Sequence, residues 1–130
     1  MHNTSITNPA ALLGRVLLAA IFLLSGGGKM GAYAATAEQM TKVGIPGGLL
    51  PFVIILELVA GLLVIIGWQT RIAALALAGF TLLATYFFHL DFGSQEQTIH
   101  FLKNMAIIGG LLGLAAAGPG GWSVEGRKAA

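Results

Sequence analysis

The sequence predicts an all-α integral membrane protein, a bundle of four transmembrane helices, and three observations support this fold class. Of its 130 residues, 56% are hydrophobic and only 9% are charged, whereas soluble domains carry about 25% charged residues. Four apolar stretches each reach the length of about 20 residues that crosses a bilayer core. Short polar or glycine-containing segments separate these stretches. At this length we expect a single transmembrane domain over residues 1–130.

The first span is expected over residues 9–28, and Arg15 is its only charged residue. Asn8 can cap this helix, and Pro9 suits its first turn, where the missing N–H leaves no bond unmade. A run of three glycines at residues 26–28 is expected to end it.

A short amphipathic helix on the membrane surface is expected between the first two spans. Residues 36–39, Thr-Ala-Glu-Gln, have the pattern of a capping box. Met40 and Val43 continue an apolar side, as in helices that lie in the bilayer interface. The alternative is a mobile loop. Residues 32–34, Ala-Tyr-Ala, resemble a signal-peptidase site, but no basic region precedes the apolar stretch, so we expect the first span to be retained.

The second and third spans are expected over residues 48–67 and 70–90. Gly67 can adopt the left-handed conformation that closes a helix, and Thr70 can cap the next one. Such a short link forces the two helices to be antiparallel neighbours. Trp68, in the link, belongs at the membrane interface.

The fourth span is expected over residues 98–118, after a polar loop at residues 91–97. Three polar residues occupy its first two turns: His100, Lys103 and Asn104. Like Arg15 in the first span, they interrupt an otherwise apolar helix.

Glu57 lies near the centre of the second span, and a charged residue there costs roughly 2.5–3.5 kcal/mol. Such a group generally has a partner, a water-filled cavity or a function. Helical rise puts Glu57 about 13 Å from the outer end of its span, Arg15 about 9 Å from the inner end of its own, and Lys103 about 7 Å from the outer end. Arg15 and Lys103 are therefore the expected partners.

Helical periodicity puts these polar residues on faces that share the bundle interior. We expect a ligand pocket, or else a buried ion pair that fixes helix packing, formed by five residues: Arg15, Glu57, His89, Lys103 and Asn104. Buried ion pairs are weak evidence for stability but can specify an arrangement. In a cavity without a close cation, Glu57 would instead be a candidate proton carrier. Interfacial anchors are expected at Lys29, Trp68 and Arg71.

Several classes of function are excluded or disfavoured by what the sequence lacks. There are no cysteines, which excludes thiol catalysis and cysteine-ligated metals or clusters within this chain. The net charge of +2 gives no support for nucleic-acid binding. His89 and His100 are compatible with a metal or haem, but no ligand motif supports one and we expect no metal. No catalytic motif is present, so whether the chain is an enzyme stays open.

Orientation follows from lysines and arginines near the span ends. Four lie on the side of the two termini and three on the other side. This small bias favours both termini in the cytoplasm.

Several sequence blocks resemble the DoxX family of small membrane proteins. The first span carries one, from Gly14-Arg15 to Phe22-Leu23-Leu24-Ser25-Gly26-Gly27-Gly28-Lys29-Met30, and the second carries Glu57-Leu58-Val59-Ala60-Gly61 and continues to Gly67, followed by Thr70-Arg71. The remaining blocks are His89, Phe101-Leu102-Lys103-Asn104 and residues 118–125, Gly-Pro-Gly-Gly-Trp-Ser-Val-Glu. The resemblance covers nearly the whole chain.

The resemblance implies a four-helix protein of the bacterial cytoplasmic (inner) membrane. It further implies that Arg15, Lys29, Glu57, His89, Lys103 and Asn104 are the family's recurrent polar positions. Members of the family are linked to quinone-dependent sulfur oxidation and to a membrane oxidoreductase complex that counters oxidative stress. A family does not transfer an activity to each member.

Our leading hypothesis is an accessory subunit that holds a quinone or a lipid-like reductant for a redox partner protein. The alternatives are a small proton-coupled transporter, acting as a homo-oligomer with Glu57 as its proton site, and a purely structural membrane protein. Membrane lipid is a partner in each case.

Overall fold

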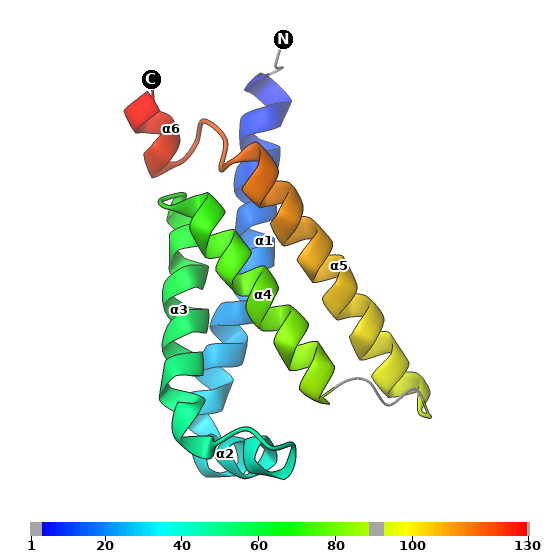
Figure 1. Ribbon diagram of the computed structural model, residues 1–130. Coiled ribbons are helices and arrows are strands. Elements are labelled where there is room, and N and C mark those ends of the chain that lie inside the picture. The colour runs from blue at the N-terminus through cyan, green and yellow to red at the C-terminus, as the bar shows by residue number, and fades with distance from the viewer. Residues whose placement is uncertain (1–3, 89–92, 130) are drawn as a thin grey trace.

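Helices account for nearly all of the computed structural model, which describes residues 4–88 and 93–129 (Figure 1). Four of them are long and apolar enough to cross a membrane: α1 (Thr4–Gly31), α3 (Leu50–Ile66), α4 (Thr70–Phe88) and α5 (Gln95–Ala117). The short elements are α2 (Tyr33–Lys42), a 3-10 turn η1 (Gly47–Leu49) and α6 (Val124–Ala129). The predicted all-α membrane bundle is confirmed.

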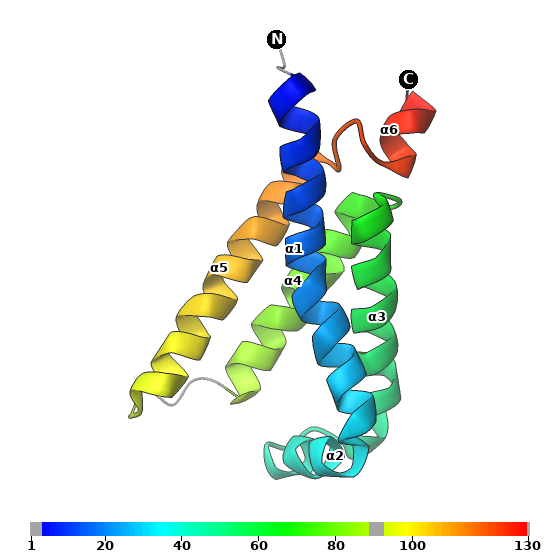
Figure 2. The same ribbon diagram turned by 180° about the vertical axis from the view of Figure 1, so that it is seen from behind.

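The four long helices pack in the order α1, α3, α4, α5, and each runs antiparallel to its neighbour in that order (Figures 1 and 2). α1 and α5 meet near the end of the bundle where α1 begins, and they diverge toward the opposite end. There α2 lies crosswise below α1 and α3. We call the end where α1 begins the strap end, because residues 118–126, the C-terminal strap, and α6 lie there (Figure 1). We call the opposite end the α2 end.

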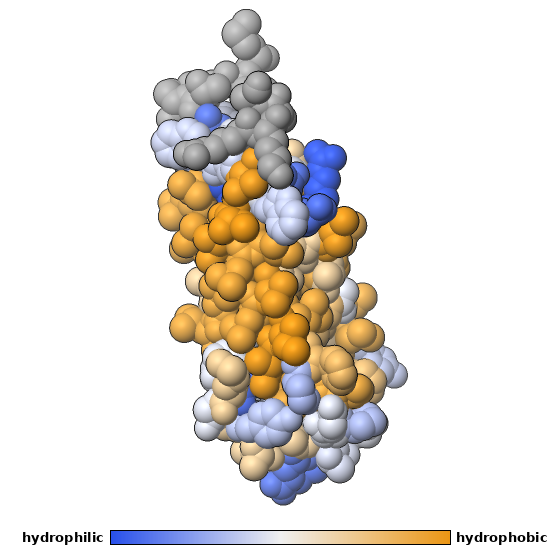
Figure 3. Space-filling model, turned by 90° about the vertical axis from the view of Figure 1, so that its left-hand side faces the viewer, coloured by the Kyte–Doolittle hydropathy of each residue, from blue (hydrophilic) through white to orange (hydrophobic). Residues whose placement is uncertain are grey.

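Small residues let α1 and α3 approach closely, as in other membrane helix pairs. A Cβ atom built on Gly26 would lie 3.0 Å from the side chain of Leu58, and one on Gly61 would lie 3.1 Å from that of Leu23. The core continues toward α4 through Ala74 and Leu77, both fully buried. The face shown in Figure 3 carries a broad apolar belt, which suits contact with lipid.

Helix α1 does not end at its glycine run, because it continues to Gly31. Backbone groups without a partner are costly where lipid excludes water, so a glycine run in a span stays helical. α2 begins at Tyr33, and Thr36 donates both its amide and its hydroxyl to the carbonyl of Ala32. The helix between the first two spans is therefore confirmed, the mobile loop is wrong, and the capping box at residues 36–39 does not form.

The two caps expected at the starts of α1 and α4 are also wrong. Pro9 lies inside α1, and the Asn8 side chain accepts a hydrogen bond from the amide of Gly121. α4 begins at Thr70, but its hydroxyl has no hydrogen-bond partner among the described residues. Gly67 does close α3 in the left-handed conformation, at φ 75°, as predicted.

The fourth span begins earlier than expected. Ser94 caps α5, and its hydroxyl accepts a hydrogen bond from the amide of Gln97. With Ser94 as its cap, the helix therefore begins at Gln95, three residues before the predicted start. The preceding part of the polar loop and His89 lie outside the described residues.

Candidate functional site

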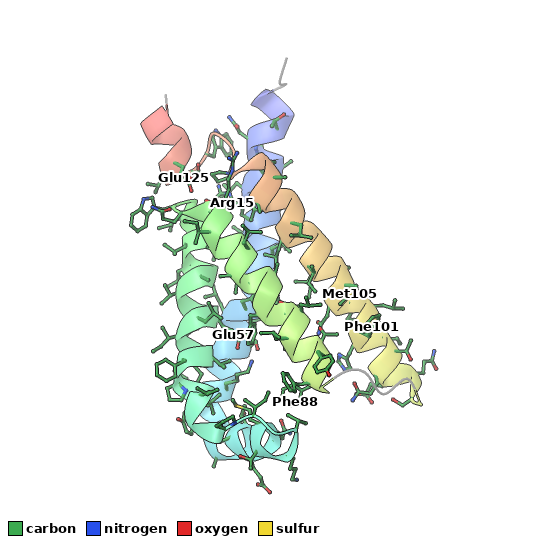
Figure 4. The ribbon with its side chains drawn as sticks, viewed as in Figure 1. Arg15, Glu57, Phe88, Phe101, Met105 and Glu125 are labelled. Atoms are coloured by element: carbon green, nitrogen blue, oxygen red, sulfur yellow. The ribbon has the colours of Figure 1, made fainter. Side chains whose placement is uncertain are left out.

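Glu57 is buried on α3, in the half of the bundle nearer the α2 end (Figure 4). Its Oε1 atom lies 2.6 Å from Nζ of Lys29 on α1. The same ammonium group donates to Oγ of Ser25 at 2.6 Å and lies 5.9 Å from the centre of the Phe80 ring, within the range of a cation–π contact. Three helices thus contribute to one polar site, which we call the Lys29 site.

The local sequence of α1 builds this site. Ser25 and Lys29 are four residues apart and share one helix face. Gly26 lies on the same side, and a Cβ atom built there would come within 3.4 Å of the Glu57 Cβ atom. The glycine therefore lets α3 come close enough for its carboxylate to meet the ammonium group.

Exposure differs sharply between the two partners of this ion pair. The Glu57 side chain is 1% exposed, whereas that of Lys29 is 25% exposed. The carboxylate therefore lies in the bundle interior and pairs with a lysine that is nearer the surface. Of the two side chains, only that of Lys29 is open to the surroundings of the bundle.

The prediction that Arg15 pairs with Glu57 is wrong. Its guanidinium donates instead to three main-chain carbonyls: Val64 at 3.1 Å, Ile65 at 2.6 Å and Trp122. α1 and α3 are antiparallel, so Arg15 lies opposite the last turn of α3 and Lys29 lies opposite Glu57. The sequence estimate failed because α1 extends to Gly31, which brings Lys29 inside the span.

Lys103 does not pair with Glu57 either, because its side chain is exposed on α5. Asn104, the next residue, does face the bundle, and its Nδ2 atom donates to the Thr85 hydroxyl at 3.0 Å. That hydroxyl in turn donates to the carbonyl of Thr81. Asn104 therefore links α5 to α4 and does not join the Lys29 site. His89, the fifth expected member, lies outside the described residues.

Two of the three expected interfacial anchors have exposed side chains at the strap end. Trp68 is 42% exposed, and the exposed Arg71 reaches Gly118, where a Cβ atom would lie 3.3 Å from its guanidinium. Lys29 is not such an anchor, because it forms the ion pair. The sequence did carry a signal for the ion pair, since Lys29 shares a helix face with Phe22 and Gly26 in α1.

A second polar cluster involves a segment that site prediction missed. The C-terminal strap, residues 118–126, lies against the turn between α3 and α4. Within the strap, Glu125 accepts a hydrogen bond from the Thr70 amide at 2.6 Å and donates its own amide to the Gly67 carbonyl at 3.0 Å. In the sequence the strap appeared only as a family block, and no local pattern indicated that Glu125 would cap α4.

Neither cluster resembles a metal centre, since no three His, Asp or Glu side chains come together in the described parts of the chain. A surface pocket of about 480 Å³ lies at the strap end, away from Glu57. Its lining residues are Leu12, Ile66, Gly121, Trp122, Ser123 and Val124.

Comparison with known proteins gives one family and two relatives. The family model described as DoxX matches residues 10–90. The inner membrane protein YqjF of Escherichia coli (strain K12) is 43% identical over 114 residues, which cover 88% of each chain. The inner membrane protein YphA of the same organism is 30% identical over 123 residues, 89% of this chain and 88% of the relative. No solved structure matches the chain significantly.

Proposed function

Because the chain belongs to the DoxX family, we propose that it is an accessory subunit of a quinone-linked redox or oxidative-stress complex in the inner membrane. In this role it holds the head group of a quinone, or of a lipid-like reductant, at the Lys29 site. It supplies no catalytic group of its own and presents the molecule to a redox partner protein.

The Lys29 ammonium group, held by Glu57 on a side chain that is itself partly exposed, is the observation that carries this proposal. Quinone carbonyl oxygens accept hydrogen bonds, and a charged donor inside a membrane makes such bonds stronger than a neutral one. Glu57 and Ser25 fix the position of this donor. The Phe80 ring beside it supplies an apolar surface for a ring-shaped head group.

The same geometry gives less support to a proton-coupled carrier. A carrier site must exchange its proton with both sides of the membrane, but the Glu57 carboxylate is buried and bonded to Lys29 at 2.6 Å. A purely structural role is the stronger alternative, because the ion pair joins α1 to α3 at a close contact.

Orientation is part of the proposal. With both termini in the cytoplasm, the Lys29 site lies in the outer half of the membrane and the strap on the cytoplasmic side. A reporter fused to the carboxyl terminus tests this. Activity of a reporter that works only in the cytoplasm is expected, and activity of one that works only in the periplasm would reverse the orientation.

The test of function is quinone retention. The protein is purified in native lipid, and mass spectrometry identifies the quinones, lipids and proteins that remain bound. We expect quinone in the wild type and in Lys103→Met, which removes an exposed lysine from a span. Lys29→Met should lose the quinone, because it removes the donor and keeps an unbranched side chain.

Added quinone provides the second readout. It should raise the melting temperature of the wild type and Lys103→Met, but not that of Lys29→Met. If no quinone is retained, and added quinone raises the melting temperature of neither the wild type nor Lys103→Met, the binding role is rejected and the structural role is supported. Equal retention by Lys29→Met would reject this site.

A further inference from the structure

The amino terminus of α4 is occupied by a carboxylate from the strap. Oε1 of Glu125 accepts the amide hydrogen bond of Thr70 at 2.6 Å. α4 is 19 residues long, and the first turn of such a helix presents unpaired N–H groups and the positive end of the helix dipole. Free phosphate and carboxylate groups bind at the same place on other helices. Glu125 thus occupies a position that suits an anion.

Two buried polar atoms on residues around the turn between α3 and α4 have no hydrogen-bond partner among the described residues. They are Oγ1 of Thr70 and Nε of Arg15, on side chains that are 0% and 1% exposed. A buried group without a partner costs about 1–3 kcal/mol, so native structures rarely leave one. Glu125 alone therefore does not satisfy the polar groups at this end of the bundle.

Both atoms belong to groups that surround the same turn. Thr70 begins the helix after the turn, and Nη1 of Arg15 lies 2.8 Å from where a Cβ atom of Gly67 would be. The amide of Glu125 is also bonded to this turn, through the Gly67 carbonyl. The guanidinium and the first turn of α4 thus face one small region that the strap covers.

The electrostatics of this region favour an anion. Within the described residues, each hydrogen bond of the Arg15 guanidinium goes to a main-chain carbonyl, and carbonyls do not neutralise a positive charge. The helix dipole of α4 adds a further partial positive charge. A ligand with several acceptor oxygens could satisfy more of these donors than a single side-chain carboxylate does.

We propose that the amino terminus of α4, together with Arg15, is a binding site for a small anion with a carboxylate or phosphate group. Glu125 is its internal substitute ligand and is displaced when the anion binds. The pocket of about 480 Å³ runs alongside the strap, and four of its lining residues belong to the strap: Gly121, Trp122, Ser123 and Val124. This open surface gives the strap room to move. The site is independent of the Lys29 site and of the proposed function.

Rescue of a Glu125→Ala variant by added anions tests this site. The full-length protein is placed in nanodiscs of phosphatidylcholine, and its melting temperature is measured with acetate, phosphate or chloride at equal ionic strength. Glu125→Ala should lose thermal stability, and acetate or phosphate should restore at least half of the loss in a saturable way. Chloride should restore much less. Glu38→Ala, which removes an exposed carboxylate from α2, should show no anion-specific effect.

Nanodiscs that contain phosphatidylglycerol distinguish the two sources of the anion. If Glu125→Ala is already stabilised by this lipid without added phosphate, the natural ligand is an acidic lipid head group. If only the soluble anions stabilise it, the ligand is a soluble anion. If the variant folds and neither the lipid nor the anions exceed chloride, the proposal is overturned.

Glu125→Gln keeps the proposal testable if the alanine variant does not fold. Glutamine still accepts the Thr70 hydrogen bond but lacks the charge, so phosphate should bind about tenfold more tightly than to the wild type. Trp122 fluorescence in a Trp68→Phe background reports this binding. Adding Arg15→Lys should weaken it again. Equal phosphate affinity in the wild type and Glu125→Gln would overturn the proposal.

Discussion

The two ends of the bundle each bury a charged side chain, and they satisfy it in different ways. At the α2 end, Glu57 meets a single opposite charge from the neighbouring helix at 2.6 Å. At the strap end, the hydrogen bonds of Arg15 to described residues all go to carbonyl oxygens, from the last turn of α3 and from the strap. An ion pair needs only two side chains at matching depths. A helix end suits satisfaction by carbonyls, because the last carbonyls of a helix have no partner within it.

The largest effect is expected from breaking the strap end at Arg15. Arg15→Met removes three hydrogen bonds from a charged donor, each of which contributes about 1.5–3 kcal/mol. We expect the free energy of unfolding to fall by at least about 4.5 kcal/mol, measured by reversible unfolding in mixed micelles.

Arg71→Met is the matched control for this substitution, because its guanidinium is exposed at the same end of the bundle. Its loss should stay within about 1 kcal/mol, as for most surface substitutions. If the two arginine variants lose similar stability, the carbonyl contacts of Arg15 do not contribute to the stability of the fold.

A smaller loss of stability is expected from disturbing the close contact between α1 and α3 beside the Lys29 site. Gly26→Ala places a Cβ atom 3.0 Å from Leu58, and overpacking of this kind costs about 1–3 kcal/mol. Gly27→Ala meets nothing within 4 Å and should be neutral or stabilising by up to about 1 kcal/mol. Thermal unfolding of the two variants compares them directly. A larger loss in Gly27→Ala would contradict the described packing of α1 on α3.

The smallest effect is expected at Asn104, which belongs to neither end. Asn104→Ala removes its hydrogen bond to Thr85, and such bonds between membrane helices contribute about 0.6 kcal/mol on average. Lys103→Met should change stability even less, because that side chain is exposed. A loss at Asn104 as large as that at Arg15 would show that the three polar regions form one network.

The four spans could be predicted from the sequence because length and hydropathy decide whether a helix crosses a bilayer. Their ends were less certain. The glycine run of α1 and the serine before α5 shifted the boundaries by three residues each, since glycines stay helical in lipid and a nearby serine caps a helix.

The pairing of the polar residues could not be predicted in the same way. Helical periodicity places Lys29 on the same face of α1 as Arg15, but it does not say which residue of an antiparallel neighbour lies opposite. That match depends on where α1 ends and on how closely Gly26 lets α3 approach. The strap was beyond prediction because Glu125 reaches Thr70 across 55 residues of sequence.

Double-mutant cycles on the free energy of unfolding test the separation of the two ends most directly. One cycle combines Lys29→Met with Glu57→Gln, and the other combines Arg15→Lys with Glu57→Gln. We predict a coupling energy of at least about 1 kcal/mol in the first cycle, and additivity within about 0.5 kcal/mol in the second. Strong coupling between Arg15 and Glu57, with none between Lys29 and Glu57, would contradict the account.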